Sequence, residues 1–386
     1  MKIGFVLNHY DLHQVPHIVP YAFEMSRDYD DCEVIIFSSS QAEEEFARKI
    51  GHGYPDHKVT FKLFRVPPLI SVVDPLLSKV VFARKKAVLK ANLDELTKLD
   101  VLVVPEMTSL ALQKLPEMKN VKLVFTGHGA GDNREFGSFN ERIGKFDLCL
   151  MPGRKYADGL REVGFLPDDR YAIAGYPKFE AVKHLTSTKR KLFKNDKPVV
   201  VYNPHHLPNY TSWASMGEQV LDYFYDNHDY NLIFCPHVLL FRRSLTKGAR
   251  FPKKYKNTPN VIIDTGSRNS VDMTYLRSAD IYIGDVSSQI YEFIEEPRPC
   301  VFLNAHKVEW QNDPSYLQWR FGELIDDATD LGPALARASE THGEYAGFQK
   351  ECFEHTFAVS KRTAGSRGAE IIAEFARSGT VADKWL

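Results

Sequence analysis

The stretch Ala279-Asp-Ile-Tyr-Ile-Gly-Asp-Val-Ser-Ser-Gln-Ile-Tyr-Glu-Phe-Ile294 decides the fold that we expect for this chain. Its first part is short and apolar up to Gly284 and Asp285, which predicts a buried strand. Its last part carries apolar residues at helical spacing. A helix is therefore expected to begin just after the strand ends, as in a sheet whose strands alternate with helices.

The turn between this strand and this helix holds Asp285, Ser287 and Ser288. Asp and Ser are preferred helix N-caps, so one interpretation is that they only start the helix. The other is that the turn binds an anion, because free backbone N–H groups and the positive end of the helix dipole point out of it. With two hydroxyls added, the turn is a candidate phosphate site.

Composition and length restrict the class of protein. The chain has 386 residues, which favours two domains, and it is 44% hydrophobic and 26% charged, as in globular proteins. The net charge of −1 gives no overall attraction to nucleic acid. The five cysteines are scattered and form no C-x-x-C pair, which indicates a reducing compartment and no structural zinc. No signal-peptide layout or membrane-length apolar run occurs, so we expect a cytoplasmic protein.

Apolar strand patterns separated by helical patterns run along most of the chain. They lie at residues 3–7, 32–38, 59–66, 101–106, 121–125, 147–151 and 171–174, and again at 198–202, 231–235, 261–264, 281–283 and 300–303. This alternation predicts the α/β class, with two Rossmann-like doubly wound domains facing a cleft. The expected boundaries are 1–178 for the N-terminal domain, 179–197 for a linker, 198–342 for the second domain and 343–386 for a helical tail.

Two histidines follow predicted strands, one in each half of the chain. His128 lies between Gly127 and Gly129, which let the backbone approach a ligand, and it is a candidate general base. A capping turn with an incidental histidine is the alternative. His237 follows the strand at 231–235 and could donate a hydrogen bond to a phosphate oxygen.

Further histidines and basic residues lie in the first loop and in two basic segments. His9, His13 and His17 lie in the first loop, but Pro16 interrupts the stretch and no H-E-x-x-H pattern occurs, so we expect them to line a cleft or cap a helix and not to bind metal. Basic residues at 84–86 and in the run 242–256 indicate either a solvated surface or contact with an anionic membrane. The run is too short for nucleic-acid recognition.

In combination, these motifs resemble those of a known family. The stretch 279–293 resembles the A-D-x-x-I-T-D-Y-S-S-x-x-F-D-F signature of CDP-glycerol glycerophosphotransferases, which build wall teichoic acid and related capsule polymers. Four further segments follow in the family's order over roughly residues 120–325, resembling its H-G, G-x-P-R, Y-A-P-T and H-P motifs: Gly127-His128-Gly129, Gly175-Tyr176-Pro177-Lys178, Tyr202-Asn203-Pro204 and Pro236-His237.

The resemblance implies a GT-B architecture, with the donor in the second domain and the acceptor in the first. It implies that Ser287 and Ser288 hold the donor pyrophosphate, that His128 activates the acceptor hydroxyl and that His237 stabilises the departing nucleotide phosphate. The residues assigned to the donor site on this basis are Gly284, Asp285, Ser287, Ser288, Pro204, His205 and Lys178. No cofactor beyond the nucleotide-activated donor is implied, and the reaction is expected to be independent of metal.

The chain also departs from the family pattern. Lys178 stands in place of Arg, which loses a bidentate contact, and Val238 stands in place of Pro. His205 and His206 replace the Thr of the Y-A-P-T segment and its neighbour, and Leu207 stands where an Arg is expected. Two alternatives stay open: a GT-B glycosyltransferase that uses a nucleotide sugar, and a non-catalytic nucleotide-binding homologue. The expected partners are a CDP-activated or other nucleotide-activated donor, a glycan or lipid-linked acceptor and the inner face of an anionic membrane, with no nucleic acid.

Overall fold

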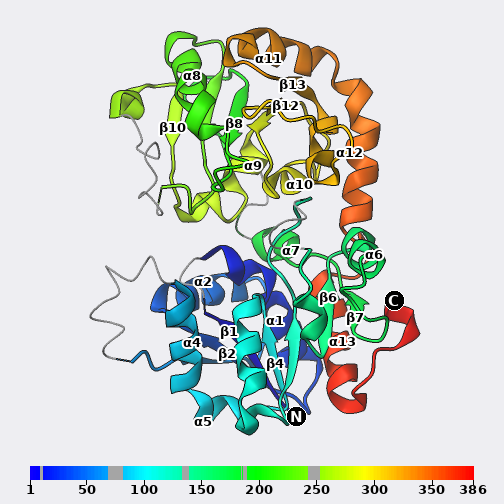
Figure 1. Ribbon diagram of the computed structural model, residues 1–386. Coiled ribbons are helices and arrows are strands. Elements are labelled where there is room, and N and C mark those ends of the chain that lie inside the picture. The colour runs from blue at the N-terminus through cyan, green and yellow to red at the C-terminus, as the bar shows by residue number, and fades with distance from the viewer. Residues whose placement is uncertain (9–11, 68–80, 133–138, 184, 186–188, 242–252) are drawn as a thin grey trace. The chain divides into compact units, whose positions relative to one another are not determined.

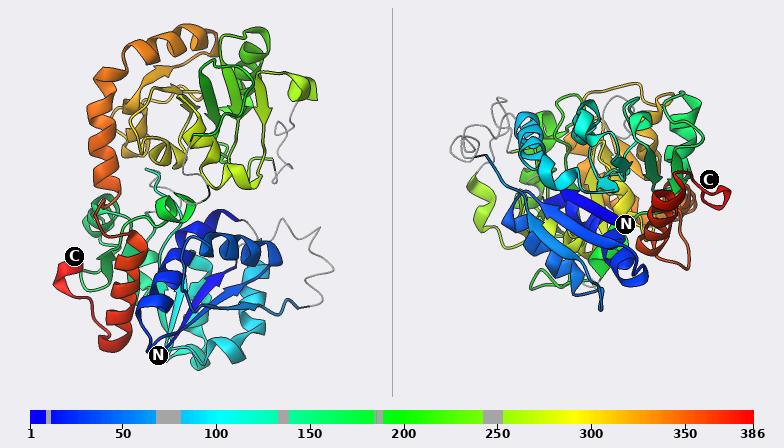
Figure 2. Two further views of the ribbon diagram at one scale, coloured as in Figure 1. Left: turned by 180° about the vertical axis from the view of Figure 1, so that it is seen from behind. Right: turned by 90° about the horizontal axis from the view of Figure 1, so that it is seen from below.

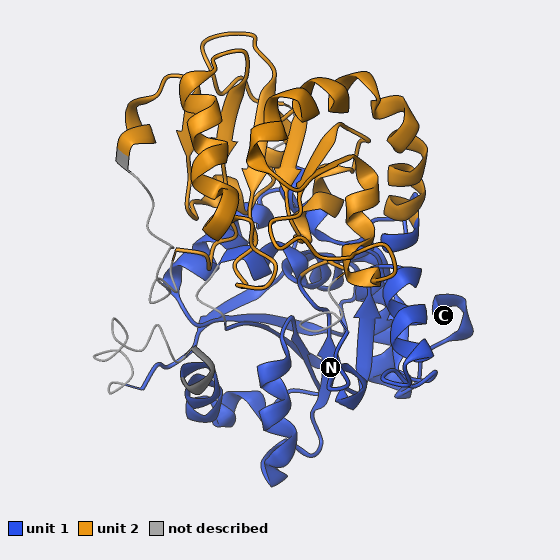
Figure 3. Ribbon diagram, turned by 45° about the horizontal axis from the view of Figure 1, so that its top comes forward, with its two compact units in different colours: residues 1–128, 139–185, 355–386 blue, residues 129–138, 186–354 orange. Residues whose placement is uncertain are grey.

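The computed structural model describes residues 1–8, 12–67, 81–132, 139–183, 185, 189–241 and 253–386. The chain divides into two compact units, which are coloured separately in Figure 3. Unit 1 consists of residues Met1–His128, Phe139–Leu185 and His355–Leu386, and unit 2 of Gly129–Ser138 and Thr186–Glu354. Neither unit is therefore a single continuous stretch of sequence.

Unit 1 is built on a parallel sheet with the strand order β3-β2-β1-β4-β5-β6-β7. Strands β1, β2, β4, β6 and β7 are labelled in Figure 1. Apolar runs such as Ile3–Leu7 form these strands, because helices cover both faces of a parallel sheet and leave few positions for polar side chains. The strands are β1 (Lys2–Leu7), β2 (Glu33–Ser38), β3 (Thr60–Leu63), β4 (Val101–Val104), β5 (Lys122–Phe125), β6 (Leu148–Met151) and β7 (Tyr171–Ile173).

The α-helices of unit 1 are α1 (Val19–Asp28), α2 (Gln41–Gly51), α4 (Val81–Ala91), α5 (Leu93–Leu96), α6 (Arg154–Glu162), α7 (Lys178–Lys183) and α13 (Ala364–Ser378). Shorter 3-10 helices connect them at η1 (Leu12–His17), η2 (Met107–Lys114), η3 (Pro116–Met118), η4 (Ile143–Lys145) and η9 (Asp383–Trp385). Helix α2 is capped by Ser40, whose hydroxyl oxygen accepts from the backbone N–H of Glu43, while the Glu43 carboxylate accepts from the Ser40 hydroxyl and from the backbone N–H of Ser39.

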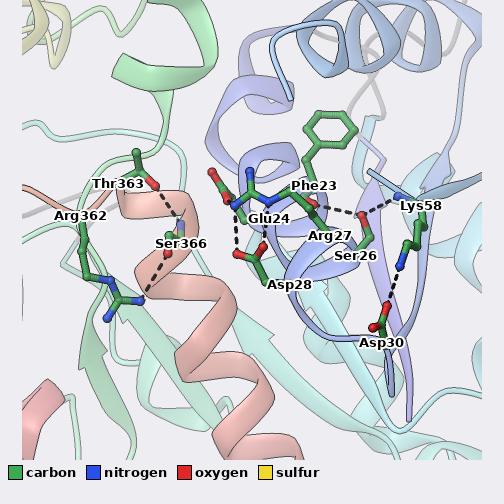
Figure 4. Close-up of polar contacts among 10 residues, drawn as sticks. All are labelled: Phe23, Glu24, Ser26, Arg27, Asp28, Asp30, Lys58, Arg362, Thr363 and Ser366. Carbon is green, nitrogen blue, oxygen red and sulfur yellow. Dashed lines mark hydrogen bonds and ion pairs between the residues drawn. The ribbon is translucent and has the colours of Figure 1, made fainter. Parts of the chain in front are cut away.

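Helix α13 comes from the end of the chain and packs along α1 (Figure 2). Glycine at position 368 permits this contact, because a Cβ atom there would lie 2.2 Å from the Tyr21 ring. Thr363 caps α13 by accepting from the backbone N–H of Ser366, at 3.1 Å (Figure 4). The C-terminal segment is thus part of the packing of unit 1.

Unit 2 repeats the architecture with a parallel sheet of order β10-β9-β8-β11-β12-β13. Its strands are β8 (Val199–Asn203), β9 (Asn231–Phe234), β10 (Val261–Ile263), β11 (Ile281–Gly284), β12 (Cys300–Leu303) and β13 (Glu323–Ile325). Its helices are α8 (Trp213–Asp226), α9 (Thr274–Ser278), α10 (Gln289–Phe293), α11 (Leu331–Glu340) and α12 (His342–Thr356), with 3-10 turns η5 (Lys253–Asn257), η6 (Arg268–Ser270), η7 (Pro314–Phe321) and η8 (Ala328–Asp330). Helices α8 and α11 bury their apolar sides against the sheet in one core.

Both sheets have the doubly wound order in which the first strand of the unit lies in the middle. The winding direction reverses between β1 and β4 in unit 1 and between β8 and β11 in unit 2. Ligands of such sheets bind outside the carboxyl ends of the strands at these reversal points. The predicted pair of Rossmann-like doubly wound units is confirmed, and it directs attention to the residues that follow β1, β4, β8 and β11.

The division into units differs from the predicted boundaries in three places. Helix α7, which starts at Lys178, belongs to unit 1, although most of it fell in the predicted linker 179–197. The predicted tail 343–386 divides after Glu354, and its second part joins unit 1. Residues Gly129–Asp132 belong to unit 2, although they lie within the predicted first domain. Apolar periodicity shows that a helix has a buried side, but not which unit it packs on.

Candidate active site

The carboxyl end of β11 lies next to that of β8, at the reversal point of unit 2. Gly284 pairs with Asn203 in the register of these two strands. A side chain at Gly284 would collide with the Tyr282 ring, because a Cβ atom there would lie 2.5 Å from it. The predicted donor residues that follow β8 and β11 are therefore brought together by the sheet.

Asp285 faces the interior of unit 2. Its carboxylate accepts hydrogen bonds from the backbone N–H groups of His205, Ser212 and Val286, at 2.6–3.1 Å, and from the Ser212 hydroxyl, at 2.8 Å. It is 1% exposed, and burial raises its pKa to about 6 in spite of these donors. Asp285 thus fixes the loop after β8, which differs from the direct donor contact that the resemblance implied.

The two serines of the turn have different surroundings. The Ser287 hydroxyl donates to the Asn203 side chain, at 2.8 Å, and the residue is 2% exposed. Ser288 is partly exposed and precedes α10 as its N-cap, without a side-chain capping bond. The Ser287 hydroxyl is thus directed at the neighbouring strand β8, whereas the Ser288 side chain is partly exposed. The assignment of both serines to the donor pyrophosphate stays a prediction, and Ser288 is the more accessible of the two.

Three histidine rings gather at the carboxyl ends of β8 and β9. The rings of His206 and His237 stack with centroids 4.1 Å apart, and His205 lies 4.5 Å from His206 and 5.6 Å from His237. The backbone N–H of His237 donates to the carbonyl of Pro204, at 3.0 Å, which ties the two loops together. Of these three, His205 and His237 are predicted site residues, whereas His206 has no predicted role.

The Nδ1 atoms of two of these rings are acceptors. Leu207 N–H donates to Nδ1 of His205 and Leu239 N–H donates to Nδ1 of His237, both at 3.2 Å. Because Nδ1 carries no proton in such a bond, the proton of the neutral ring is on Nε2. Burial, and secondarily His206, lower the pKa of His205 to about 3, so this ring is neutral near pH 7. Both residues therefore present Nε2–H donors.

His128 follows β5 in unit 1 and has the opposite tautomer. Gly127 adopts a φ of +67° in the turn before it, a conformation that glycine allows. The imidazole Nδ1 lies 2.7 Å from the carbonyl oxygen of Pro105, after β4, and 3.4 Å from the Gln14 amide. A carbonyl oxygen can only accept, so the shorter contact puts the proton on Nδ1 and leaves Nε2 as the basic nitrogen.

Other polar residues of unit 1 surround this histidine. The His13 ring lies edge-on to it, with centroids 5.4 Å apart. Burial lowers the pKa of His17 well below its usual value, and the charges of Lys178 and His128 lower it further. Lys178 is buried at the start of α7. It belongs to unit 1, whereas the other predicted donor residues belong to unit 2. His9 lies outside the described residues.

The chain first passes from unit 1 to unit 2 at the peptide bond between His128 and Gly129. Within unit 2, a Cβ atom on Gly131 would lie 3.3 Å from the Ser288 Cβ, so this segment lies against the Ser288 turn. The hydroxyl of Tyr291 lies 2.8 Å from both carboxylate oxygens of Asp132. Tyr291 has no predicted role, because a single sequence does not show that two polar residues so far apart in the chain form a hydrogen bond.

The basic residues predicted to contact a membrane can also be located in the structure. Arg84 and Lys85 are buried, at 7% and 3% exposed, so they cannot contact lipid headgroups as the sequence suggested. Most of the basic run 242–256 lies outside the described residues.

Within the described ranges no group of three His, Cys, Asp or Glu side chains could hold a metal ion. Among these residues no helix is both long enough and apolar enough to span a bilayer.

Comparison with known proteins identifies the family to which the chain belongs. The family model described as CDP-Glycerol:Poly(glycerophosphate) glycerophosphotransferase matches residues 102–367, more than half of the chain. The chain belongs to this family. It is accordingly a CDP-glycerol glycerophosphotransferase-like transferase, as the signature around Ser287 and Ser288 predicted. Among curated proteins, none matches the chain.

Solved structures agree on the fold of this glycerophosphotransferase-family chain. The wall teichoic acid polymerase TagF is similar with a TM-score of 0.64 and 16% identity, covering 98% of this chain and 90% of that one. A putative UDP-N-acetylglucosamine 2-epimerase from Listeria monocytogenes is similar with a TM-score of 0.61 and 12% identity, covering 98% and 97%. At these identities the similarity establishes the architecture, which is GT-B as predicted.

Proposed function

We propose that this protein transfers a glycerophosphate-type group from a CDP-activated donor to a hydroxyl of a glycan or lipid-linked acceptor, in the synthesis of a cell-envelope polymer such as teichoic acid. The observation that carries the proposal is the pair of opposite tautomers: a basic Nε2 on His128 and an Nε2–H donor on His237. Transfer of a phosphoryl group to a hydroxyl needs one group of each kind, a proton acceptor and an anion-stabilising donor.

On the acceptor side, His128 takes the proton of the attacking hydroxyl on Nε2. The acceptor oxygen bonds to the glycerol-bearing phosphorus of the donor, and the bond from that phosphorus to the bridging oxygen breaks. CMP leaves with the bridging oxygen, and the product is a phosphodiester. The bond from Nδ1 to the Pro105 carbonyl orients the ring and stabilises the imidazolium that forms.

On the donor side, His237 and His205 donate from Nε2 to the diphosphate oxygens. Because the Nδ1 atoms already accept backbone N–H groups, these rings are oriented before the donor arrives. The partly exposed Ser288 hydroxyl supplies a further contact. Asp285 does not contact the donor itself. It positions His205 by accepting a hydrogen bond from the backbone N–H of that residue.

We also propose that transfer proceeds without a metal cofactor. Neutral imidazole donors and the turn at Ser288 supply the contacts that a divalent cation provides to the diphosphate in other phosphoryl transferases.

For the acceptor, we propose that a lipid-linked polymer is met at the inner face of the membrane. The exposed residues Lys86 and Lys90 are one helical turn apart on α4, while Arg84 and Lys85 of the same helix are buried. Sedimentation with phosphatidylglycerol vesicles at low and high salt tests this contact. Salt-sensitive binding that Lys86→Glu and Lys90→Glu together abolish supports it, and no binding at low salt contradicts it.

The function itself is tested by incubating the protein with labelled CDP-glycerol and a glycerophosphate-primed acceptor. We expect stoichiometric release of CMP and labelled glycerophosphate on the acceptor. Parallel reactions with UDP- and GDP-sugars separate the alternatives, because a glycosyltransferase releases UDP or GDP instead. Binding of CDP-glycerol without turnover on any acceptor would indicate the non-catalytic homologue.

A further inference from the structure

Residues Gly129–Asp132 are a short piece of chain that follows His128 directly and belongs to unit 2. Both of its glycines approach the Ser288 turn. A Cβ atom on Gly129 would lie 3.7 Å from the Ser288 hydroxyl oxygen, and one on Gly131 would lie 3.3 Å from the Ser288 Cβ. The second distance leaves almost no room for a side chain, so the segment is held close to the turn.

The end of this segment is anchored by a buried hydrogen bond. The Tyr291 hydroxyl donates to the Asp132 carboxylate, centred between its two oxygens at 2.8 Å from each. Tyr291 is 0% exposed and Asp132 is 4% exposed. A hydrogen bond to a buried carboxylate is stronger than one to a neutral acceptor. Removal of the Tyr291 hydroxyl would take one hydrogen-bond donor away from the Asp132 carboxylate, which is costly for a buried polar group.

Tyr291 and Ser288 lie on the same turn of chain. The backbone N–H of Tyr291 donates to the carbonyl of Ser288, at 3.2 Å, at the start of α10. The bond to Asp132 therefore joins the Gly129–Asp132 segment to the same helix that carries the candidate donor contact. The segment itself begins one peptide bond after the candidate base.

We propose that Asp132 and Tyr291 are positioning residues of the transfer reaction. Their bond fixes Gly129–Asp132 on the Ser288 turn and so fixes the point at which the chain leaves unit 2 toward His128. This inference rests on the proposed function. Asp132 does not take the acceptor proton, because its carboxylate is buried and directed at Tyr291.

The test compares Tyr291→Phe with a matched control in the same unit. Tyr255 donates to the Asp222 carboxylate, at 2.7 Å, so Tyr255→Phe removes the same kind of bond away from the segment. With saturating acceptor and CDP-glycerol, Tyr291→Phe is expected to lower kcat about tenfold to a hundredfold, as a displaced reacting group does. Tyr255→Phe is expected to leave kcat within about twofold, and the Kd for CDP-glycerol is expected to stay within about twofold in both variants.

A conservative change at Asp132 tests the pairing itself. Asp132→Asn keeps an oxygen that accepts from the Tyr291 hydroxyl, so most of kcat is expected to remain, whereas Asp132→Ala is expected to match Tyr291→Phe. The double variant Asp132→Ala with Tyr291→Phe is expected to be no slower than either single variant, because both remove one interaction. Additive losses would mean that the two residues act separately and would overturn the proposal.

Hydrogen exchange gives a readout that does not depend on transfer. Amides in Gly129–Asp132 are expected to exchange at least about tenfold faster in Tyr291→Phe than in the unmodified protein or in Tyr255→Phe, since local opening becomes easier. Unchanged exchange, or equal acceleration and equal loss of kcat in both Phe variants, contradicts the inference. If the unmodified protein transfers nothing from CDP-glycerol, the proposed function fails, while the exchange result still shows whether the anchor exists.

Discussion

His128 after β5 and His237 after β9 are the same residue type at equivalent ends of two similar sheets, yet their protons lie on different nitrogens. Nδ1 of His128 faces a carbonyl oxygen and must donate, whereas Nδ1 of His237 faces a backbone N–H and must accept. The first ring is left with a basic Nε2 and the second with an Nε2–H donor. The partner of Nδ1, and not the motif around the ring, therefore decides which chemistry each histidine can perform.

Of the changes that test the two histidine roles, substitution of His128 is expected to lower turnover most. His128→Ala removes the base, and kcat should fall by roughly 10²–10⁴-fold, while the Kd for CDP-glycerol changes little. Steady-state kinetics with saturating acceptor and titration of the donor measure the two quantities. Near-normal turnover in a well-folded variant would move the base elsewhere, and the adjacent His13 would be the next candidate.

A change at His237 should weaken both binding and turnover. His237→Ala removes an Nε2–H donor to the diphosphate, and kcat/KM is expected to fall about a hundredfold, at the lower end of what one such donor supplies. The Kd for CDP-glycerol should rise as well, unlike in His128→Ala. His237→Gln offers an N–H donor in place of the imidazole and should recover part of the loss. Identical kinetic patterns in the two alanine variants would mean that the opposite tautomers have no separate roles.

The next effect concerns the residue that holds the donor-side loop. Asp285→Asn replaces a carboxylate that accepts from several donors by an amide whose N–H₂ must face some of them. The free energy of unfolding of unit 2 should fall by about 2–3 kcal/mol, the cost of leaving buried donors without acceptors. Urea denaturation followed by circular dichroism checks this. Wild-type stability together with wild-type donor affinity would contradict the scaffolding role.

A buried carboxyl outside both histidine sites should give a smaller, pH-dependent effect. Glu180 accepts from the backbone N–H of Gly365, at 2.5 Å, and burial raises its pKa from 4.5 to about 7. Because the folded state binds this proton more tightly than the unfolded chain does, its contribution to stability is full below about pH 4.5 and is lost as the pH rises to about 7.

The contribution is on the order of 1–3 kcal/mol. Glu180→Gln keeps an oxygen for Gly365 and should flatten the dependence of Tm on pH between these values. The variant also helps to assign the pH dependence of turnover to the histidines. A limb of the pH–rate profile that remains in Glu180→Gln arises from the reacting groups and not from the titration of Glu180. A Tm profile that is the same in both proteins would contradict the role of Glu180.

The smallest effect is expected from removal of metal. Because imidazole donors are proposed to contact the diphosphate, dialysis against EDTA should change kcat by less than about twofold, and added Mg²⁺ should not restore or raise it. Loss of turnover in EDTA that Mg²⁺ reverses would show that the neutral donors do not suffice.

Sequence reasoning was most successful where one short stretch carries the whole signal. The strand at 281–283 and the position of His128 and His237 after strands could be predicted, because apolar runs and strand ends are local features. The orientation of Asp285 and Ser287 could not, since both polar side chains are held by residues of the neighbouring strand β8 and its loop. A polar residue at a strand end looks the same in sequence whether it faces ligand or core.

The burial of basic residues and the packing partners of distant helices could not be predicted from the sequence either. Charge alone predicted an exposed surface at residues 84–86, but Arg84 and Lys85 turn inward on α4 and burial lowers the pKa of both. The sequence predicts a helical tail at residues 343–386, and only the fold identifies α1 as the neighbour of α13. Long-range pairs such as Tyr291 with Asp132 leave no trace in a single sequence.

The return of residues 355–386 to unit 1 has a consequence for how the protein is made. Translation delivers β1 and α1 early, but Ile371, Ile372 and Phe375 of α13, which are buried in this unit, emerge only after all of unit 2. Unit 2 is therefore the first to have its complete set of residues outside the ribosome, although unit 1 begins the chain. Until α13 arrives, the apolar side of α1 lacks its cover, which is the kind of surface that chaperones bind on nascent chains.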